Sequence, residues 1–284
     1  MLFICPTPIG NLQDVTLRVL EVLAAAHVVV CEDTRHTRRL LERHLVRPAR
    51  LLSFHEHNEP ARLETVLTLL REGKDVALVS DAGMPGLSDP GFTLVRAAAA
   101  EGLPVTVLPG PSAVSTALVA SGLPTDRFAF VGFLPRGTAK VVAALERAGC
   151  AGGSVVAFES PRRLRSTLRA VAGRWPDRPL AVCRELSKLH EQVLRGTAGA
   201  VLERLPEPVR GEIVLVLGPV DTPAAGTGGQ GSRATNAQLE AVLAGLVRSG
   251  LGTKEAAGLV ASLTGVPVRE LYAAALEAKR HLLE

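Results

Sequence analysis

Residues 76–91 read VALVSDAGMPGLSDPG, and this segment indicates the fold class. Four apolar residues lead directly into a loop that holds three glycines, two prolines and two aspartates, and a helical pattern resumes at Phe92. A short apolar run bounded by turn residues is typical of a strand buried on both faces of a sheet. Strand, glycine-rich loop and helix in this order indicate one unit of an α/β domain.

The same alternation extends in both directions from this stretch. Apolar strand patterns are expected at residues 2–5, 28–33, 51–54, 76–81 and 105–110, with helical patterns between them. Their near-continuous apolar character predicts a parallel sheet covered on both faces. A second series of strand patterns lies at 128–135, 154–161, 179–186, 191–197 and 211–218. Hairpin-like and crossover spacings alternate there, so the second sheet is expected to be mixed.

The fold class is therefore α/β, with two α/β domains and a small C-terminal helical module. The expected boundaries are 1–122 for the first domain, 123–218 for the second, 219–235 for a flexible linker and 236–284 for the helical module. The linker is rich in small residues and lacks periodicity. It contains a GxGxxG match at 226–231, but that match lies far from the preceding strand and lacks a following strand, so a nicotinamide-binding site is not expected.

Composition limits the setting of the protein without naming its activity. The chain has 284 residues, a formal net charge of +4 and four scattered cysteines without CxxC spacing. This cysteine pattern is typical of a reducing, cytoplasmic compartment and does not indicate a metal site. The sequence lacks an apolar run near the roughly 20 residues that a membrane span requires, so we expect a protein without a membrane segment.

Ligands in open parallel sheets collect beyond the carboxyl ends of the strands, so the loops after strands are the candidate sites. In the opening stretch, Asp81 stands where the strand ends and can accept hydrogen bonds. The turn Pro109–Ala113 begins a helix with Ser112 as its expected N-cap, and a helix N-terminus offers free amides. We expect these two turns to belong to neighbouring strands and to hold a compact organic ligand, because the Walker phosphate signature is lacking. The alternative is a pair of rigid structural turns.

Two further loops carry groups suited to acid–base chemistry. Asp33 and Arg35 follow the second strand, and His55 and Glu56 follow the third. His55, Glu56, His57 and Glu59 together could indicate a metal site. Adjacent positions of one loop, however, rarely direct three side chains at the same ion. The alternative for Asp33 and Arg35 is a surface ion pair.

Basic side chains are concentrated between residues 160 and 190. Eight Arg and Lys residues face only two acidic residues there, and arginine predominates. Arginine suits bidentate contact with phosphate, so this excess favours a nucleic-acid partner over a merely solvated helix face. Aromatic residues make up only 3% of the chain, so contacts with sugar and phosphate would outweigh stacking on bases. The expected RNA contacts are Arg162, Arg163, Arg165 and Arg169.

Several of these motifs together resemble one known family. In order and spacing, the chain is similar to the ribosomal RNA small subunit methyltransferase I group of the tetrapyrrole methylase superfamily, over about residues 3–217. The motifs that carry the resemblance are PTPIGNLQDVTLR, CEDTRHTRRLL, SFHEHNE, VSDAGMPGLSDPG, LPGPSA, SGLPTDRFAFVGFLPR, FESPRRL and CRELSKLHE.

The resemblance implies an S-adenosylmethionine-dependent enzyme with its cofactor between two α/β domains, and usually a homodimer. It implies methylation of the ribose 2′-hydroxyl of a cytidine in the decoding centre of 16S rRNA, within the small ribosomal subunit. The first loop of the chain, residues 7–11, reads TPIGN, as in the RNA-directed group of the superfamily. The positions that the resemblance assigns to the cofactor are Asp81, Ala82, Gly83, Pro85, Leu87, Ser112, Ala113, Phe158, Glu159, Arg184, Glu185, Gly211 and Glu212.

Methyl transfer to a ribose hydroxyl needs a group that removes the hydroxyl proton. Asp33, Glu56 and His55 are the candidates for this base, and Asn11 and Arg35 are expected to orient the sugar and its phosphate. Two alternatives remain open from the sequence: a methylase of a small tetrapyrrole-like substrate, and a non-catalytic RNA-binding protein of ribosome assembly. The C-terminal helical module has a helix-turn-helix pattern, and our hypothesis is that this module binds RNA.

Overall fold

The computed structural model describes residues 1–55, 58–88, 90–149, 152–220, 236–249, 251–264 and 266–280. The chain divides into two compact units, Met1–Asp221 and Thr222–Glu284. The first unit contains two five-stranded sheets, and the second contains three helices. The proposed linker 219–235 lies almost entirely outside the described residues.

The first sheet is parallel throughout, as the sequence predicts. Its strand order is β3-β2-β4-β1-β5. The bounds of its strands are β1 Leu2–Ile4, β2 Val28–Cys31, β3 Leu51–Ser53, β4 Val76–Val79 and β5 Val105–Val107. Every residue of β2 and β4 is buried, which explains their unbroken apolar sequences.

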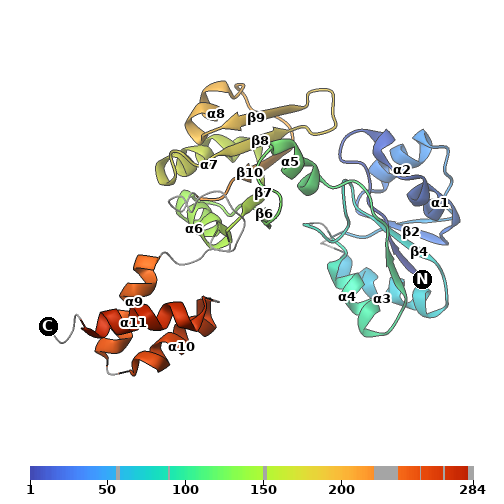
Figure 1. The fold of residues 1–284 in the computed structure, drawn as a ribbon. Helices are drawn as coiled ribbons and strands as arrows, with labels where there is room; N and C mark the ends of the chain where they lie inside the picture. Colours follow the sequence, from blue (N-terminus) through green and yellow to red (C-terminus); the bar gives the residue numbers. More distant parts are fainter. Residues whose placement is uncertain are drawn as a thin grey trace. The chain divides into compact units, whose positions relative to one another are not determined.

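Helices cover both faces of this sheet (Figure 1). Helices α1 (Leu17–Ala25) and α2 (Thr34–Arg43) pack on one face, and α3 (Glu59–Arg71) and α4 (Phe92–Ala100) pack on the other. Side chains of the N-cap residues fix where the first two helices begin: Thr16 accepts from the amide of Val19, and Asp33 accepts from the amide of Arg35. A short 3₁₀ turn, η1 (Leu12–Asp14), follows the loop after β1.

The second sheet is mixed, which also confirms the prediction. Strand β6 pairs with β7 in parallel, whereas the other neighbours pair antiparallel in the order β6-β7-β10-β8-β9. The bounds are β6 Phe128–Phe133, β7 Ser154–Glu159, β8 Leu180–Arg184, β9 Gln192–Gly196 and β10 Ile213–Leu217.

Alternate residues of these strands face two different cores. On one face of the sheet pack α6 (Thr138–Gly149), α7 (Pro161–Arg174) and α8 (Ala198–Arg204). On the other face packs α5 (Ala113–Ser121), which contacts Val156, Cys183 and Val214. Helix α8, capped by Thr197, is a helix that the sequence analysis did not foresee.

Helix α5 therefore belongs physically to the second sheet, although its sequence position places it within the expected first domain, 1–122. The helix follows β5 of the first sheet and ends at Gly122, which adopts the left-handed conformation typical of a helix terminus. Its N-terminus consequently lies where the two sheets meet (Figure 1). This arrangement places the turn before α5 at a junction between the two halves of the unit.

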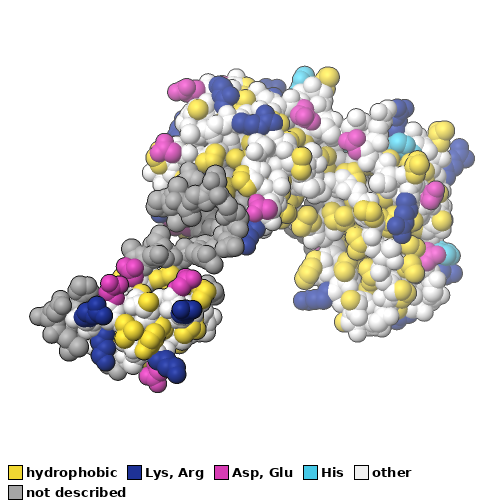
Figure 2. All heavy atoms as spheres, in the orientation of Figure 1, with side chains coloured by type: hydrophobic (Ala, Val, Ile, Leu, Met, Phe, Trp, Pro, Cys, Tyr) yellow, Lys and Arg dark blue, Asp and Glu magenta, His cyan; other side chains and the backbone are white. Residues whose placement is uncertain are grey.

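The second unit consists of α9 (Asn236–Arg248), α10 (Thr253–Thr264) and α11 (Val268–Arg280). Its core is small and apolar and includes Leu243, Val260 and Leu271. Three helices at these positions confirm the helical module that the sequence predicts. Figure 2 shows hydrophobic side chains on the visible face of this unit. Val268, Tyr272 and Leu276 of α11 are among its exposed hydrophobic residues.

Candidate active site

The loop 80–91 is held by the loop after β1. Thr7 and Gly83 form an isolated antiparallel bridge in which each backbone amide donates to the other residue's carbonyl oxygen at 2.9 Å. The buried Thr7 hydroxyl also donates to the Ser80 carbonyl oxygen at 3.0 Å. Within the loop, Gly83, Gly86, Ser88 and Gly91 all have positive φ angles. The loop therefore has a fixed and tightly folded path.

The two turns that the sequence analysis singled out follow strands that are not neighbours, and this corrects the expectation. Strand β1 lies between β4 and β5, because the connection through α4 crosses over β1. Three loops, after β1, β4 and β5, therefore contribute to the site instead of two. Ile9, from the loop after β1, is the residue that this correction adds.

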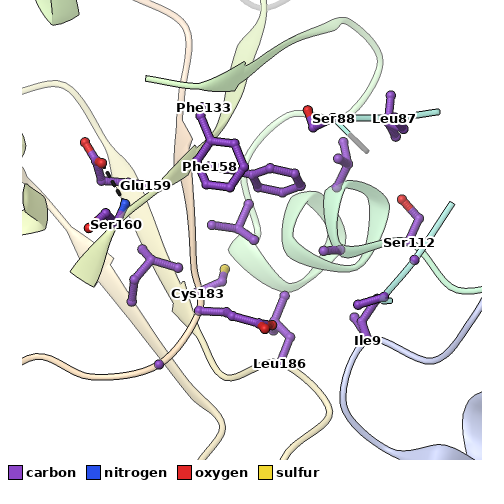
Figure 3. A pocket seen from close by; sticks show the side chains of 18 of the residues that line it. Ile9, Leu87, Ser88, Ser112, Phe133, Phe158, Glu159, Ser160, Cys183 and Leu186 are labelled. Atoms are coloured by element: carbon purple, nitrogen blue, oxygen red, sulfur yellow. Dashed lines mark hydrogen bonds between the residues drawn. The ribbon is translucent and has the colours of Figure 1, made fainter. Parts of the chain in front are cut away.

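A cavity of about 400 Å³, called here the first cavity, lies between these loops and the second sheet. This volume is within the range of about 300–1,000 Å³ that is usual for small-molecule sites. Figure 3 shows Ile9 and Ser112 on one side of it, and Phe133, Phe158 and Cys183 on the other. Its lining residues are Ile9, Ala82, Gly83, Met84, Leu87, Ser88, Ser112, Ala113, Val114, Phe133, Phe158, Glu159, Ser160, Pro161, Cys183, Leu186, Gly211, Glu212, Ile213 and Val214.

Most of the lining is apolar, with a few polar groups at its edges. Phe158 packs edge-on against both Phe130 and Phe133, with ring centroids 5.0 and 5.3 Å apart. Burial raises the pKa of the Cys183 thiol to about 11, so this thiol stays protonated at neutral pH. The apolar wall therefore offers a surface for packing an aromatic or aliphatic ligand, and Cys183 acts there as a hydrophobic side chain.

The N-terminus of α5 opens onto this cavity. Ser112 occupies the N-cap position, as expected, but its side chain makes no capping hydrogen bond with a described residue. The first-turn amides of α5 are thus left without the side-chain partner that usually satisfies them. Such amides bind carboxylates and other polar groups of ligands.

Nine of the thirteen positions assigned to the cofactor line the first cavity. They are Ala82, Gly83, Leu87, Ser112, Ala113, Phe158, Glu159, Gly211 and Glu212. The remaining four positions, Asp81, Pro85, Arg184 and Glu185, lie elsewhere: Asp81 lines a neighbouring cavity, Pro85 is buried, and Arg184 donates to Gln192 and to the Arg210 carbonyl oxygen.

The carboxylate of Glu159 is turned away from the first cavity (Figure 3). Its side chain is 0% exposed and pairs with Arg163 at 2.7 Å. It also accepts hydrogen bonds from the Ser160 amide at 2.7 Å and the Thr167 hydroxyl at 2.5 Å. This carboxylate therefore holds the end of β7 to the first turns of α7.

Glu185 and Gly211 form a tight contact at the edge of the second sheet. Glu185 Oε1 accepts from the Glu212 amide at 2.9 Å and pairs with Lys188 Nζ at 2.9 Å. A Cβ at Gly211 would lie only 2.5 Å from Glu185 Cγ, so this approach requires glycine. Glu185 therefore positions the backbone that lines the first cavity, and its own side chain lies outside that lining.

Lys188 continues this cluster toward the first sheet. It pairs with Glu212 at 3.0 Å, and its side chain lies against Gly10, where a Cβ would come within 2.4 Å of Lys188 Cγ. The amide of Asn11 donates to Ser187 Oγ at 3.1 Å. Burial lowers the pKa of Lys188, but its hydrogen bonds to Glu185 and Glu212 raise it more, so it remains a cation. These contacts tie the loop after β1 to the loop 185–191.

A second cavity of about 300 Å³ adjoins the first, and both are lined by Ile9, Ala82 and Glu212. The second cavity is more polar. Its other lining residues are Thr7, Pro8, Gly10, Leu12, His36, Thr37, Arg39, Leu40, Ser80, Asp81 and Lys188. The second cavity thus places several charged and hydroxyl side chains among apolar ones, at the carboxyl ends of β1, β2 and β4.

The described candidates for the base and for orienting the sugar are not among the residues that line this cavity. They are Asn11, Asp33, Arg35 and His55. Asp33 and Arg35 bond to each other, with Arg35 Nη2 at 2.7 Å from Asp33 Oδ2. The hydrogen bonds from the side chain and amide of Arg35 hold the pKa of Asp33 well below its usual range, so this carboxylate is a poor proton acceptor. His55 Nε2 lies 3.1 Å from Asn58 Nδ2 within its own loop. Glu56 lies outside the described residues.

His36 is a polar residue of the second cavity that the sequence analysis missed. It lies in the first turn of α2, and its Nδ1 is 3.7 Å from Asp81 Oδ2. The other oxygen of Asp81 accepts from the Asp33 amide at 3.0 Å. His36 and Asp81 are 45 positions apart in the chain, so local sequence patterns could not pair them, although the motif around Asp33 contains His36.

The expected RNA-contacting arginines fall into two groups. Arg163 donates to the carbonyl oxygens of Leu134 and Pro135 and pairs with Glu159, and Arg165 donates to the Leu205 carbonyl oxygen. The excess of charge between 160 and 190 is therefore partly structural. Arg162 and Arg169 are exposed and make no ion pair with a described residue.

Buried Arg178 extends this structural group. Its side chain donates to the Gly218 carbonyl oxygen and stacks on Trp175. Basic side chains on the visible face in Figure 2 lie apart from one another. Among the arginines counted between residues 160 and 190, Arg163, Arg165 and Arg178 thus bond to backbone carbonyl oxygens within the chain.

Two limits on the site come from the described part of the chain. None of its helices is long and apolar enough to cross a membrane. None of its clusters of His, Cys, Asp and Glu reaches the three groups that a metal site would need.

The fold is that of a tetrapyrrole methylase. Residues 1–202 match the family model for Tetrapyrrole (Corrin/Porphyrin) Methylases, and residues 233–279 match the model for the RsmI C-terminal HTH domain. The uroporphyrin-III C-methyl transferase of Thermus thermophilus, solved in complex with S-adenyl homocysteine, has a TM-score of 0.54 at 22% sequence identity. That likeness covers 77% of this chain and 97% of the other, and it shows the shared fold.

Two curated relatives define the family more narrowly. Both are named Ribosomal RNA small subunit methyltransferase I. The protein of Hydrogenobaculum sp. is 43% identical over 78% of this chain and 96% of its own length. The protein of Micromonospora olivasterospora is 43% identical over 95% of this chain and 85% of its own length. The chain belongs to the ribosomal RNA small subunit methyltransferase I family of methyltransferases.

Proposed function

We propose that the chain methylates the ribose 2′-hydroxyl of a cytidine in the decoding centre of small-subunit ribosomal RNA. The observation that carries this proposal is the pair of adjoining cavities that share Ile9, Ala82 and Glu212, of which the second contains more charged side chains. A donor in the first cavity and a sugar in the second would meet at this shared wall. The names of the relatives support ribosomal RNA of the small subunit as the substrate.

The methyl donor is S-adenosylmethionine, and the first cavity suits it. An adenine ring fits against apolar walls such as Phe158 and Val214, and the first-turn amides of α5 suit its polar groups. The backbone of Ala82 and Gly83, the turn at Ser112 and Ala113, and the side chain of Leu87 would hold the molecule. When bound, the donor supplies a methyl group on a positively charged sulfur. The chain itself supplies alignment of the two reactants and exclusion of water.

The second cavity favours a sugar–phosphate acceptor over a tetrapyrrole. A macrocycle would require a wide apolar bowl, whereas this chamber of about 300 Å³ also contains charged side chains among its apolar residues. They are Asp81, His36, Arg39, Lys188 and Glu212. A carboxylate accepts hydrogen bonds from ribose hydroxyls, a protein hydroxyl can donate or accept them, and cations attract phosphate. The TPIGN loop forms one wall of the chamber, which agrees with its resemblance to the RNA-directed group.

Exposed arginines beside the cavities are proposed to contact the RNA backbone. Arg162 follows directly after Ser160 and Pro161, which line the first cavity, and Arg169 lies two turns further along the same helix. Replacing both by glutamine is expected to weaken binding to small ribosomal subunits. The double replacement should also reduce the steepness of the plot of log association constant against log salt concentration by about 1–2. Each lost phosphate contact removes about 0.9 from that slope.

The control for this prediction is Arg174→Gln on the same helix. Arg174 is engaged with Glu146 at 2.7 Å, so its removal should leave the salt slope unchanged. Binding can be measured by filter retention of labelled subunits at several salt concentrations. An unchanged slope in the double variant would show that α7 does not face the RNA.

The remaining expectations concern partners and setting. We propose that the enzyme acts in the cytoplasm as a homodimer, and that the unit of α9, α10 and α11 provides a second RNA contact. The match of residues 233–279 to a helix-turn-helix model supports a nucleic-acid role for this unit.

The proposed function is tested by transfer of tritiated methyl groups to purified small subunits. We expect label in the 16S rRNA, and the modified position should resist alkaline cleavage because the 2′-hydroxyl is blocked. Nuclease mapping then identifies the nucleotide. Label on an added porphyrinoid instead of RNA would support the small-molecule alternative, and binding of subunits without any transfer would support a non-catalytic role.

A further inference from the structure

The second cavity contains only a few groups that could accept a proton. Its titratable lining residues are His36, Arg39, Asp81, Lys188 and Glu212. Arginine remains charged at neutral pH, and Lys188 is held as a cation between Glu185 and Glu212. Glu212 is itself occupied by Lys188. This leaves His36 and Asp81, which face each other.

The geometry of these two residues is that of a base and its orienting group. His36 is placed by α2, whose start is fixed by the Asp33 cap. Asp81 is placed by the end of β4, and its Oδ1 is held by the Asp33 amide at 3.0 Å. Asp81 Oδ2 is then left 3.7 Å from His36 Nδ1. A carboxylate on one ring nitrogen of a histidine sets the tautomer and leaves the other nitrogen as the acceptor.

We propose that His36 is the general base of the methyl transfer and that Asp81 is its positioning residue. This inference rests on the proposed function, because it takes a ribose hydroxyl as the acceptor. The hydroxyl oxygen forms the new bond to the methyl carbon while the sulfur–methyl bond of the donor breaks and its electron pair stays on sulfur. The hydroxyl proton passes to Nε2 of His36. The positive charge of the donor thus ends on the imidazolium, which Asp81 stabilises.

Exposure and distance are both compatible with this role. The His36 side chain is 56% exposed and the Asp81 side chain 32%, so an acceptor and its proton can reach the ring. The separation of 3.7 Å exceeds a hydrogen bond, so the proposal requires the imidazole and Asp81 to approach each other when the substrate binds. Catalytic hydrogen bonds are often long before the substrate binds. Asp81 lines the second cavity rather than the first, so we place it beside the methyl acceptor and not beside the donor.

The first test replaces His36 by alanine and measures single-turnover methyl transfer to small subunits. We expect the rate to fall by at least about 100-fold, because general bases contribute about 10²–10⁴-fold. The affinities for S-adenosylmethionine and for the subunits should stay within about twofold of wild type, and added imidazole should restore part of the rate. The matched control is His27→Ala, at the opposite end of the first sheet. Its activity should be normal and insensitive to imidazole.

The second test does not depend on activity. Nitrogen chemical shifts of the His36 ring report which nitrogen carries the proton, and we expect Asp81→Asn to change that distribution in the enzyme without ligands. Asp81→Asn should also slow transfer without weakening the binding of S-adenosylmethionine. A matching loss of donor affinity would instead assign Asp81 to the cofactor and overturn its positioning role.

The outcomes separate this inference from the proposed function. Transfer by His36→Ala within about threefold of wild type would overturn the inference while leaving the proposed function intact. Loss without imidazole rescue, accompanied by an equal loss of subunit binding, would make His36 an RNA contact. If wild-type enzyme fails to modify ribose, the proposed function fails, and with it the role of His36 as base; the ring-nitrogen shifts then report only the pairing with Asp81.

Discussion

Replacing Ala113 by tryptophan is expected to weaken the binding of S-adenosylmethionine by at least about 100-fold, which corresponds to about 2.7 kcal/mol. Ala113 begins α5 and lines the first cavity, where a small side chain leaves room for a ligand. An indole at this position would fill space that the donor requires. Titration calorimetry with purified enzyme measures the effect directly.

The control for this prediction places the same side chain on the same helix but outside the cavity. Val119 of α5 is exposed, so Val119→Trp should bind the donor with wild-type affinity. Circular dichroism of both variants checks that the fold persists. Donor affinity within about threefold of wild type in a folded Ala113→Trp protein would place the donor somewhere other than the first cavity.

Replacing Glu159 by alanine is expected to lower the free energy of unfolding by about 3 kcal/mol, because the buried carboxylate accepts several hydrogen bonds, one of them from a cation. The lost carboxylate would leave Arg163 and Thr167 without their shared partner at the junction of β7 and α7. For a unit of this size the midpoint of thermal unfolding should fall by roughly 10 °C. Differential scanning calorimetry measures the change.

A surface pair in the same domain provides the comparison. Glu146 and Arg174 are 40% and 55% exposed, and such pairs contribute at most about 1 kcal/mol, so Glu146→Ala should change stability little. Glu159→Gln keeps the shape of the side chain, so its loss of unfolding free energy should lie between those of Glu159→Ala and Glu146→Ala. Normal stability of Glu159→Ala combined with a large loss of donor affinity would show that this carboxylate contacts the donor rather than the helix.

The two sheets could be predicted from the sequence because their strands carry the physical signal locally. Buried runs such as VVVC and VALV alternate with helical patterns, and this order defines a parallel sheet. The order of the strands carries no such signal. Strand β1 lies between β4 and β5, so the loop that contains Ile9 joined the site only once the topology was known.

The loops of the site could be located from sequence, but the work of each side chain could not. Glu159 and Arg163 are one helical turn apart, yet only their burial shows that they bond to each other rather than to a ligand. Arg165 and Arg178 looked like part of a basic surface and instead bond backbone carbonyl oxygens within the chain. Formal charge is a property of the sequence, whereas exposure depends on packing.

Contacts between residues far apart in the chain also could not be predicted from local sequence patterns. His36 and Asp81 belong to different loops, and α5 leaves the first sheet to pack against the second. These long-range contacts arise from the topology and not from neighbouring residues in the chain. They are the same contacts that bring the two cavities together.

The central claim is that the donor binds in the first cavity, between the loop after β4, the turn before α5 and the second sheet. A crystal structure of the enzyme with S-adenosylhomocysteine, the product form of the donor, tests it most directly. We predict that the ligand lies against Gly83, Ser112 and Phe158, with its sulfur toward the wall shared with the second cavity. A ligand bound at any other place in the chain would contradict the account.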